Sequence, residues 1–111
     1  MQYHSSFPAC RHALLFLSLC VTGHAGFASM GQDIVCAAAS ILVYTAAELA
    51  LDMERRGQLR RAPVLHLKPG DAQIRFTPDA AGRQRAETGL ETVGYGFSLL
   101  AKKYPRCIRV A

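Results

Sequence analysis

Two side chains twelve positions apart, His24 and Cys36, can together perform nucleophilic catalysis. Cys36 is the third residue of an expected helix capped by Asp33, where free backbone N–H groups and the helix dipole favour the thiolate. The thiolate is the form of cysteine that attacks a carbonyl carbon. His24 stands on a glycine-flanked turn, from which it can fold back as general base and general acid. Ser40 lies one helical turn beyond Cys36 on the same face and can position either partner.

Each of these residues also has a purely structural interpretation. A cysteine in an alanine-rich helix is usually a small core residue, and Asp33 can act as a helix cap alone. The four cysteines, Cys10, Cys20, Cys36 and Cys107, include no Cys-x-x-Cys pair, and no histidine pair stands at zinc-ligand spacing beside them. We therefore expect no metal site, and we assign no role to Cys10, Cys20 or Cys107.

The segment that delivers His24 has two interpretations. Residues 11–25, RHALLFLSLCVTGHA, combine a positive start, an apolar centre and a small-x-small ending, as signal peptides do. The same short apolar run, ending in Thr-Gly, is typical of a buried strand. The first interpretation describes a small secreted protein, and the second describes a domain in which His24 follows a strand.

Beyond this segment the pattern predicts a helix and then a hairpin. Apolar residues at three- and four-residue spacing predict a helix over Ile34–Arg56, and Gly57 is well placed to end it. The alternating segments Pro63–Leu67 and Gln73–Phe76 predict two strands. The turn residues Pro69-Gly70-Asp71 between them predict a β-hairpin.

A second helix is expected to begin after Thr77 or slightly later, beyond Gly82, and to end before Pro105. Three glycines weaken it, so tertiary packing must hold it: Gly89, Gly94 and Gly96. A short strand is expected within Cys107–Val110. The order strand–helix–strand–strand–helix predicts an α+β fold, a two-layer sandwich in which a small, mainly antiparallel sheet packs against two helices.

Size and charge limit the possible functions. The 111 residues suit one domain and exclude a barrel enzyme or a complete dinucleotide-binding domain. The longest apolar run, residues 34–47, has fourteen residues. A bilayer needs about twenty, so no membrane partner is expected. The net charge of +5 and pI of 9.3 suit an RNA binder. The basic residues, however, follow the two predicted helices, where they favour the helix dipole. A non-catalytic ribosome- or RNA-associated module is the alternative to an enzyme.

Residues 23–40, GHAGFASMGQDIVCAAAS, resemble the signature of the ribosomal-processing cysteine protease (Prp) family. That signature combines a Gly-His-Ala-Gly turn with a Gly-x-Asp-Ile-Val-Cys-Ala-Ala-x-Ser helix start at this separation. Residues 96–110, GFSLLAKKYPRCIRV, are similar to the family's final helix and its Tyr-Pro stop. With the hairpin between them, the resemblance covers residues 13–110.

The resemblance implies a cysteine endopeptidase in which Cys36 is the nucleophile and His24 the general base. Asp33, Ser40 and Gly23 would support the site. The loop between the two catalytic residues would meet an apolar substrate segment; its members are Ala25, Gly26, Phe27, Met30 and Gly31 within residues 25–32. Members of the family remove a short N-terminal extension from a large-subunit ribosomal protein. They are small cytoplasmic homodimers without a cofactor, and their substrate places them near ribosomal RNA.

The N-terminus departs from the family pattern. Residues 1–12, MQYHSSFPACRH, lack the alternation of the family's first strand, and Pro8 would interrupt one. We therefore expect an irregular segment over residues 1–12 and a single protease domain over residues 13–111. Within the resemblance, the strand interpretation is preferred to the signal peptide. Cleavage after Ala25 would remove His24 and leave Cys36 without its base.

Overall fold

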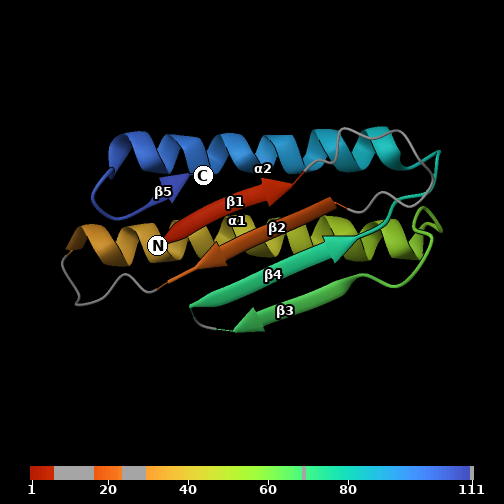
Figure 1. The fold of residues 1–111 in the computed structure, drawn as a ribbon, viewed down its shortest axis with the longest axis horizontal. Helices are drawn as coiled ribbons and strands as arrows, with labels where there is room; N and C mark the ends of the chain where they lie inside the picture. Colours follow the sequence, from red (N-terminus) through yellow and green to blue (C-terminus); the bar gives the residue numbers. More distant parts are fainter. Residues whose placement is uncertain (7–16, 24–29, 69, 111) are drawn as a thin grey trace.

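Two helices lie against one face of a five-stranded sheet in the computed structural model, which describes residues 1–6, 17–23, 30–68 and 70–110 (Figure 1). The strands are β1 (Gln2–Ser6), β2 (Leu17–Thr22), β3 (Val64–Lys68), β4 (Asp71–Phe76) and β5 (Arg109–Val110). Their order in the sheet is β3-β4-β2-β1-β5, and β1 with β5 is the one parallel pair. This arrangement confirms the predicted two-layer α+β fold with a mainly antiparallel sheet.

The apolar segment before His24 contains a central strand. In β2, Leu17, Leu19 and Val21 are buried against the helices and alternate with more exposed residues. Such period-two alternation belongs to a strand with one face on the core. Because β2 pairs with β1 on one side and with β4 on the other, the strand interpretation is confirmed for Leu17–Thr22.

The expectation of an irregular N-terminus is wrong for β1, Gln2–Ser6. This strand pairs with β2 along its length, from Gln2 opposite Thr22 to Ser6 opposite Ser18. Its one described core side chain is Tyr3, which is 2% exposed and stacks on Phe97 with ring centroids 4.0 Å apart. β1 is therefore held in the sheet by pairing with β2 and β5 and by the buried ring of Tyr3. It lacks the alternating apolar side chains by which a strand is usually recognised in a sequence.

Helix α1 (Met30–Arg55) starts four residues before the predicted Ile34. Asp33 is consequently inside the helix, and its predicted role as N-cap is wrong. The other end agrees with prediction, because Gly57 has a φ of +70°. The Gly57 N–H donates to the Glu54 carbonyl at 3.0 Å and the Gln58 N–H donates to the Met53 carbonyl at 2.9 Å. This pair of bonds is the Schellman motif that ends many helices.

The length of α1 also corrects the expectation that no segment is long enough to span a membrane. Residues Ile34–Arg55 are long and apolar enough to cross a bilayer by length and composition, whereas sequence reasoning counted only the uninterrupted run. Core helices pass the same test, and α1 packs one face on the sheet through Val35, Ala39, Val43 and Ala46. Apolar side chains on the outer face add to the hydropathy of the segment, since Ile34 and Ile41 are more than half exposed.

Helix α2 (Arg83–Lys103) follows Gly82, the later of the two predicted starts, and ends at Tyr104, before Pro105 as predicted. It runs antiparallel to α1 (Figure 1). Its glycines make this contact possible: a Cβ on Gly89 would lie 2.3 Å from the Leu49 Cδ2, and one on Gly96 would lie 2.6 Å from the Leu42 Cδ2. This close packing supports the prediction that tertiary contacts hold α2, which stays a prediction.

Candidate active site

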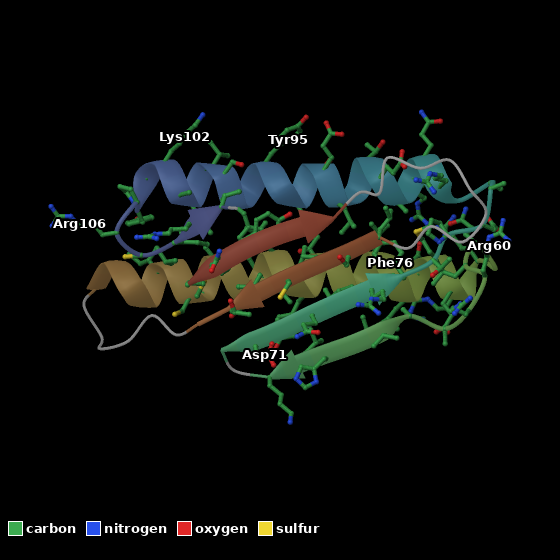
Figure 2. The ribbon with its side chains drawn as sticks, in the orientation of Figure 1. Arg60, Asp71, Phe76, Tyr95, Lys102 and Arg106 are labelled. Atoms are coloured by element: carbon green, nitrogen blue, oxygen red, sulfur yellow. The ribbon has the colours of Figure 1, made fainter. Side chains whose placement is uncertain are left out.

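One end of the molecule gathers the elements that carry the predicted site. The end of β2, the start of α1 and the turn between β3 and β4 all lie at the left of Figure 1. The segment that joins α2 to β5 lies at the same end. The predicted hairpin is present, with Gly70 at φ +76° beside the first residue of β4, Asp71 (Figure 2).

Cys36 lies in α1, six residues after the first helical residue, Met30, and is half-buried. The predicted position in the first turn is therefore wrong. The free N–H groups belong to the first four residues of a helix, and the dipole effect fades within the first turn. The helix end consequently gives Cys36 less help in forming a thiolate than the sequence suggested, and a neighbouring base must supply more of it.

Gly23 links β2 to His24 and is fixed by the hairpin turn. Its φ of +95° lies in the left-handed region that favours glycine. Its N–H donates to the carbonyl of Gly70 at 2.9 Å, and a Cβ at this position would lie 3.3 Å from the Cα of Met1. The chain therefore leaves the sheet toward His24 in a direction set by its own backbone and by the hairpin.

The other predicted site residues fall into two groups. His24, Ala25, Gly26 and Phe27 lie outside the described residues, so the pairing of His24 with Cys36 stays a prediction. Met30, Gly31 and Asp33 belong to the first turns of α1. The expected loop over residues 25–32 therefore ends before Met30, because the helix starts earlier than its sequence signals indicate.

Ser40 lies on α1 one turn after Cys36, as predicted, and it lines a cavity of about 230 Å³. Other lining residues on α1 are Ala39, Val43 and Tyr44. The opposite wall comes from the first residue of the chain, β2, the turn and the two strands of the hairpin: Met1, Val21, Gly23, Leu67, Lys68, Gly70, Asp71 and Ala72. In the sequence, Cys36 precedes Ser40 by one helical turn, and Gly23 immediately precedes His24, which lies outside the described residues.

Sequence reasoning missed the hairpin wall of this cavity. Tyr44 could have been predicted from the sequence, because it follows Cys36 by eight residues and therefore lies on the same side of the helix. Lys68, Asp71 and Ala72 carry no such signal, because their place in the cavity depends on the pairing of β4 with β2. Only the register, which sets Ala72 opposite Val21, brings the hairpin to this end of α1.

A second thiol, Cys20, lies on β2 next to the hairpin. Burial, and then the negative charge of Asp71, raise the pKa of the Cys20 thiol. Asp71 is 3.2 Å from His66 Nε2 and accepts a bond from Gln73 Nε2 at 3.4 Å. A thiol with a raised pKa forms little thiolate at neutral pH, so Cys20 is a poor nucleophile.

In residues 1–6, 17–23, 30–68 and 70–110, no three His, Cys, Asp or Glu side chains gather to hold a metal ion.

Comparison with known proteins identifies a matching family and a shared fold. Residues 10–109 match the family model described as cysteine protease Prp. A structure of the essential ribosomal processing protease Prp from S. aureus with a substrate peptide is 16% identical, with a TM-score of 0.64 over 99% of this chain and 96% of that chain. The same protein with a covalently linked product peptide is 20% identical, with a TM-score of 0.68 over 98% and 95% of the two chains.

SMU.848 from Streptococcus mutans is 22% identical, with a TM-score of 0.57 over 98% of this chain and 91% of that chain. No curated protein matches the chain significantly. The structural similarities show a shared fold, while the family model covers nearly the whole chain and includes both predicted catalytic residues. The chain therefore belongs to the cysteine protease Prp family and is a cysteine protease.

Proposed function

We propose that the chain is an endopeptidase that removes a short N-terminal extension from a large-subunit ribosomal protein, with Cys36 as nucleophile and His24 as general base. The observation that carries the proposal is the family match over residues 10–109, which includes both residues. The S. aureus relatives support a peptide substrate, because they were solved with a substrate peptide and with a covalently linked product peptide.

The proposed reaction proceeds through an acyl-enzyme. His24 takes the proton of the Cys36 thiol, and the thiolate sulfur attacks the carbonyl carbon of the scissile peptide bond. The protonated imidazole then gives its proton to the leaving amine as the carbon–nitrogen bond breaks, which leaves a thioester on Cys36. A water molecule, deprotonated by His24, attacks the thioester and releases the new carboxyl end, and the thiol regains its proton.

The described residues support these roles for Cys36 and His24. Cys36 stands in the second turn of a long, packed helix, so its position is fixed by α1 rather than by a loop. Gly23, held by Gly70 at 2.9 Å, fixes the point from which the chain reaches His24. Because Cys36 is beyond the first helical turn, the base is expected to contribute most of the activation.

Cleavage of a peptide that spans the ribosomal protein's extension and its mature start tests the proposal. The purified chain should cut it at one bond, identified by mass spectrometry, and Cys36→Ala should abolish cleavage. Cys107→Ala is the matched control, since Cys107 is a free thiol on the segment before β5. It should retain cleavage. If the unmutated, folded chain leaves the soluble peptide intact, or Cys36→Ala still cuts it, the proposal is wrong.

We also propose that the protein is a cytoplasmic homodimer. Large apolar side chains on the outer faces of both helices support self-association: Ile34, Ile41, Tyr95 and Leu99 are all more than half exposed. Tyr95 points away from the sheet in Figure 2. Light scattering after size-exclusion chromatography should give twice the mass of 12.1 kDa, and a monomer at micromolar concentration would contradict this state.

A further inference from the structure

The end of the molecule that holds the predicted site carries five cationic side chains, one at the end of β3 and four around the end of α2: Lys68, Lys102, Lys103, Arg106 and Arg109. Lys102 and Arg106 lie at this end in Figure 2, and Arg60 lies at the other. We propose that this end is a binding surface for the phosphate backbone of RNA, in which Arg106 and Arg109 make the central contacts. This binding function is separate from the proposed proteolysis and does not depend on it.

The acidic residues lie mostly toward the other end. The chain has eight, and all of them belong to the part that the structure describes. Six lie in the second half of α1, before α2 or in the first half of α2: Glu48, Asp52, Glu54, Asp79, Glu87 and Glu91. The two at the site end are Asp33 and Asp71, and Asp71 lies 3.2 Å from His66 Nε2. Positive charge is therefore in excess at the site end.

The helix dipoles do not neutralise this excess. α1 begins at the site end and α2 ends there, so the positive end of one dipole and the negative end of the other lie at the same end of the molecule (Figure 1). Each is equivalent to about half a charge, and the two contributions offset each other. Lys102, Arg106 and Arg109 form no salt bridge with any described residue. Their charge is therefore available to an anion from outside the molecule.

A groove of about 600 Å³ opens at this end, between the start of β1, the end of β2 and the segment that joins α2 to β5. The described residues that line it include two arginines and no acidic residue: Met1, Gln2, Thr22, Gly23, Pro105, Arg106, Cys107, Ile108 and Arg109. Backbone bonds fix its shape. The Arg109 N–H donates to the Met1 carbonyl at 3.0 Å, and the Cys107 N–H donates to the Tyr104 carbonyl at 2.9 Å. An anion therefore meets a groove that is already formed.

The strand register continues this polar lining across the whole sheet. One residue from each strand stands at the same level, in the order Arg109, Gln2, Thr22, Asp71 and Lys68. Such partners point to one face of a sheet, and here it is the face without helices, because the next residue of β1, Tyr3, is buried on the helix side. Neighbouring strands lie about 4.8 Å apart, so the row spans about 19 Å and has a cation at each end. The groove and the row together form a surface long enough for several anions in a chain.

The chemistry of this surface favours a nucleic-acid backbone. The planar guanidinium of arginine binds two phosphate oxygens at once, and glutamine and threonine side chains also donate to phosphates. Arg106, Gln2 and Thr22 supply these groups at the groove, and all three are exposed. RNA carries one charge at every nucleotide, which suits cations spread along a surface. No aromatic residue appears among the described residues that line the groove, so we expect contacts to the backbone and no preference for particular bases.

The experiment measures the anisotropy of a fluorescein-labelled uridine RNA of about 16 nucleotides as the full chain is added, at salt concentrations from about 50 to about 200 mM. If a single strand engages four cations, log K falls with log salt at a slope of about −2.8, which is about a 50-fold loss of affinity over this range. Arg106→Gln with Arg109→Gln should weaken binding at the lowest salt by about tenfold and reduce the slope to about −1.4. Arg60→Gln with Arg61→Gln is the matched control, because both arginines are exposed near the other end and the net charge changes equally. It should change the affinity by less than about twofold.

Several results would overturn the proposal. The folded, unmutated chain does not bind the RNA at low salt, or the two double variants weaken binding equally. A glutamate peptide with the same number of charges competes as well as the RNA does, which would assign the surface to an acidic protein segment. Adenosine and uridine RNAs of one length differ in affinity by more than about tenfold, which would mean that bases are read. Thermal unfolding shows whether each variant is folded, and Lys102→Gln with Lys103→Gln decides the matter should the Arg106 and Arg109 variant not fold. Binding is measured without a peptide, so its result is independent of whether the chain cleaves one.

Discussion

At the residue scale, the position of Cys36 changes how its sulfur is activated. A thiol in the first turn of a helix is helped by free N–H groups, but Cys36 follows the first helical residue by six positions. The sequence misplaced it because Asp33 is a good capping residue, whereas α1 begins three residues earlier, at Met30. The helical face shared by Cys36 and Ser40 was still predicted correctly, since that face depends only on their spacing.

The first prediction concerns His24. His24→Ala should lower kcat/KM for the cleaved peptide by about 10²–10⁴, the usual contribution of general acid–base catalysis. It should also slow alkylation of Cys36 by iodoacetamide at pH 7, because the helix end contributes little to thiolate formation. His66→Ala, on β3, is the matched histidine control. Equal alkylation of Cys36 with and without His24 would show that His24 is not its base.

The second prediction uses the raised pKa of Cys20. Because burial and Asp71 disfavour its thiolate, Cys20 stays protonated at neutral pH and gains reactivity only as the pH rises into the alkaline range. Timed alkylation followed by peptide mass mapping should therefore modify Cys36 before Cys20 at pH 7, and the difference should narrow as the pH is raised. Asp71→Asn should shift the Cys20 profile to lower pH. Faster labelling of Cys20 than of Cys36 at pH 7 would contradict the prediction.

At the element scale, the fold was predictable where periodicity carried the information. The ends of α1 and α2 follow from Gly57 and Pro105, which act through local backbone geometry. β1 was missed because its residues, QYHSS, offer one apolar side chain, Tyr3. The strand is held by bonds to β2 and β5, and a partner twelve or more positions away leaves no local signal.

The third prediction concerns the seam between the helices. Alanine favours a helix over glycine by about 1 kcal/mol, but a Cβ on Gly89 would lie 2.3 Å from the Leu49 Cδ2. Overpacking usually costs about 1–3 kcal/mol, so Gly89→Ala should destabilise the protein by up to about 2 kcal/mol net. In the Leu49→Ala background the same substitution should be stabilising, because the clash is gone. Urea unfolding of the four proteins of this cycle measures the coupling, and additivity would show that Leu49 moves aside freely.

At the scale of the whole molecule, the net charge of +5 is unevenly placed. Near the end of α1, Arg55 and Arg56 are paired with Glu48 and Asp52 at 2.9–3.5 Å. The sequence after Glu91 contains no acidic residue, so Lys102, Lys103, Arg106 and Arg109 have no acidic side chain near them in the sequence. Lys102 and Arg106 lie at the end of the molecule that holds the site, far from Arg60 (Figure 2). Counting the basic residues alone suggested two similar clusters, and they are distinguished by the ion pairs of α1 and by the absence of acidic residues after Glu91.

The fourth prediction follows from this uneven field. An excess of positive charge beside the site should attract acidic peptides and repel basic ones, with an effect on association that salt screens over about 10 Å at 0.1 M. Of two peptides with the same cleaved segment, the one with flanking glutamates should have a several-fold higher kcat/KM at low salt than the one with flanking lysines. Raising the salt should lower the first value and raise the second, so that they converge. If the two peptides have equal kcat/KM values at every salt concentration, the basic end does not act on the substrate. If RNA binds at this end with steep salt dependence and blocks cleavage, these cations serve to bind ribosomal RNA instead.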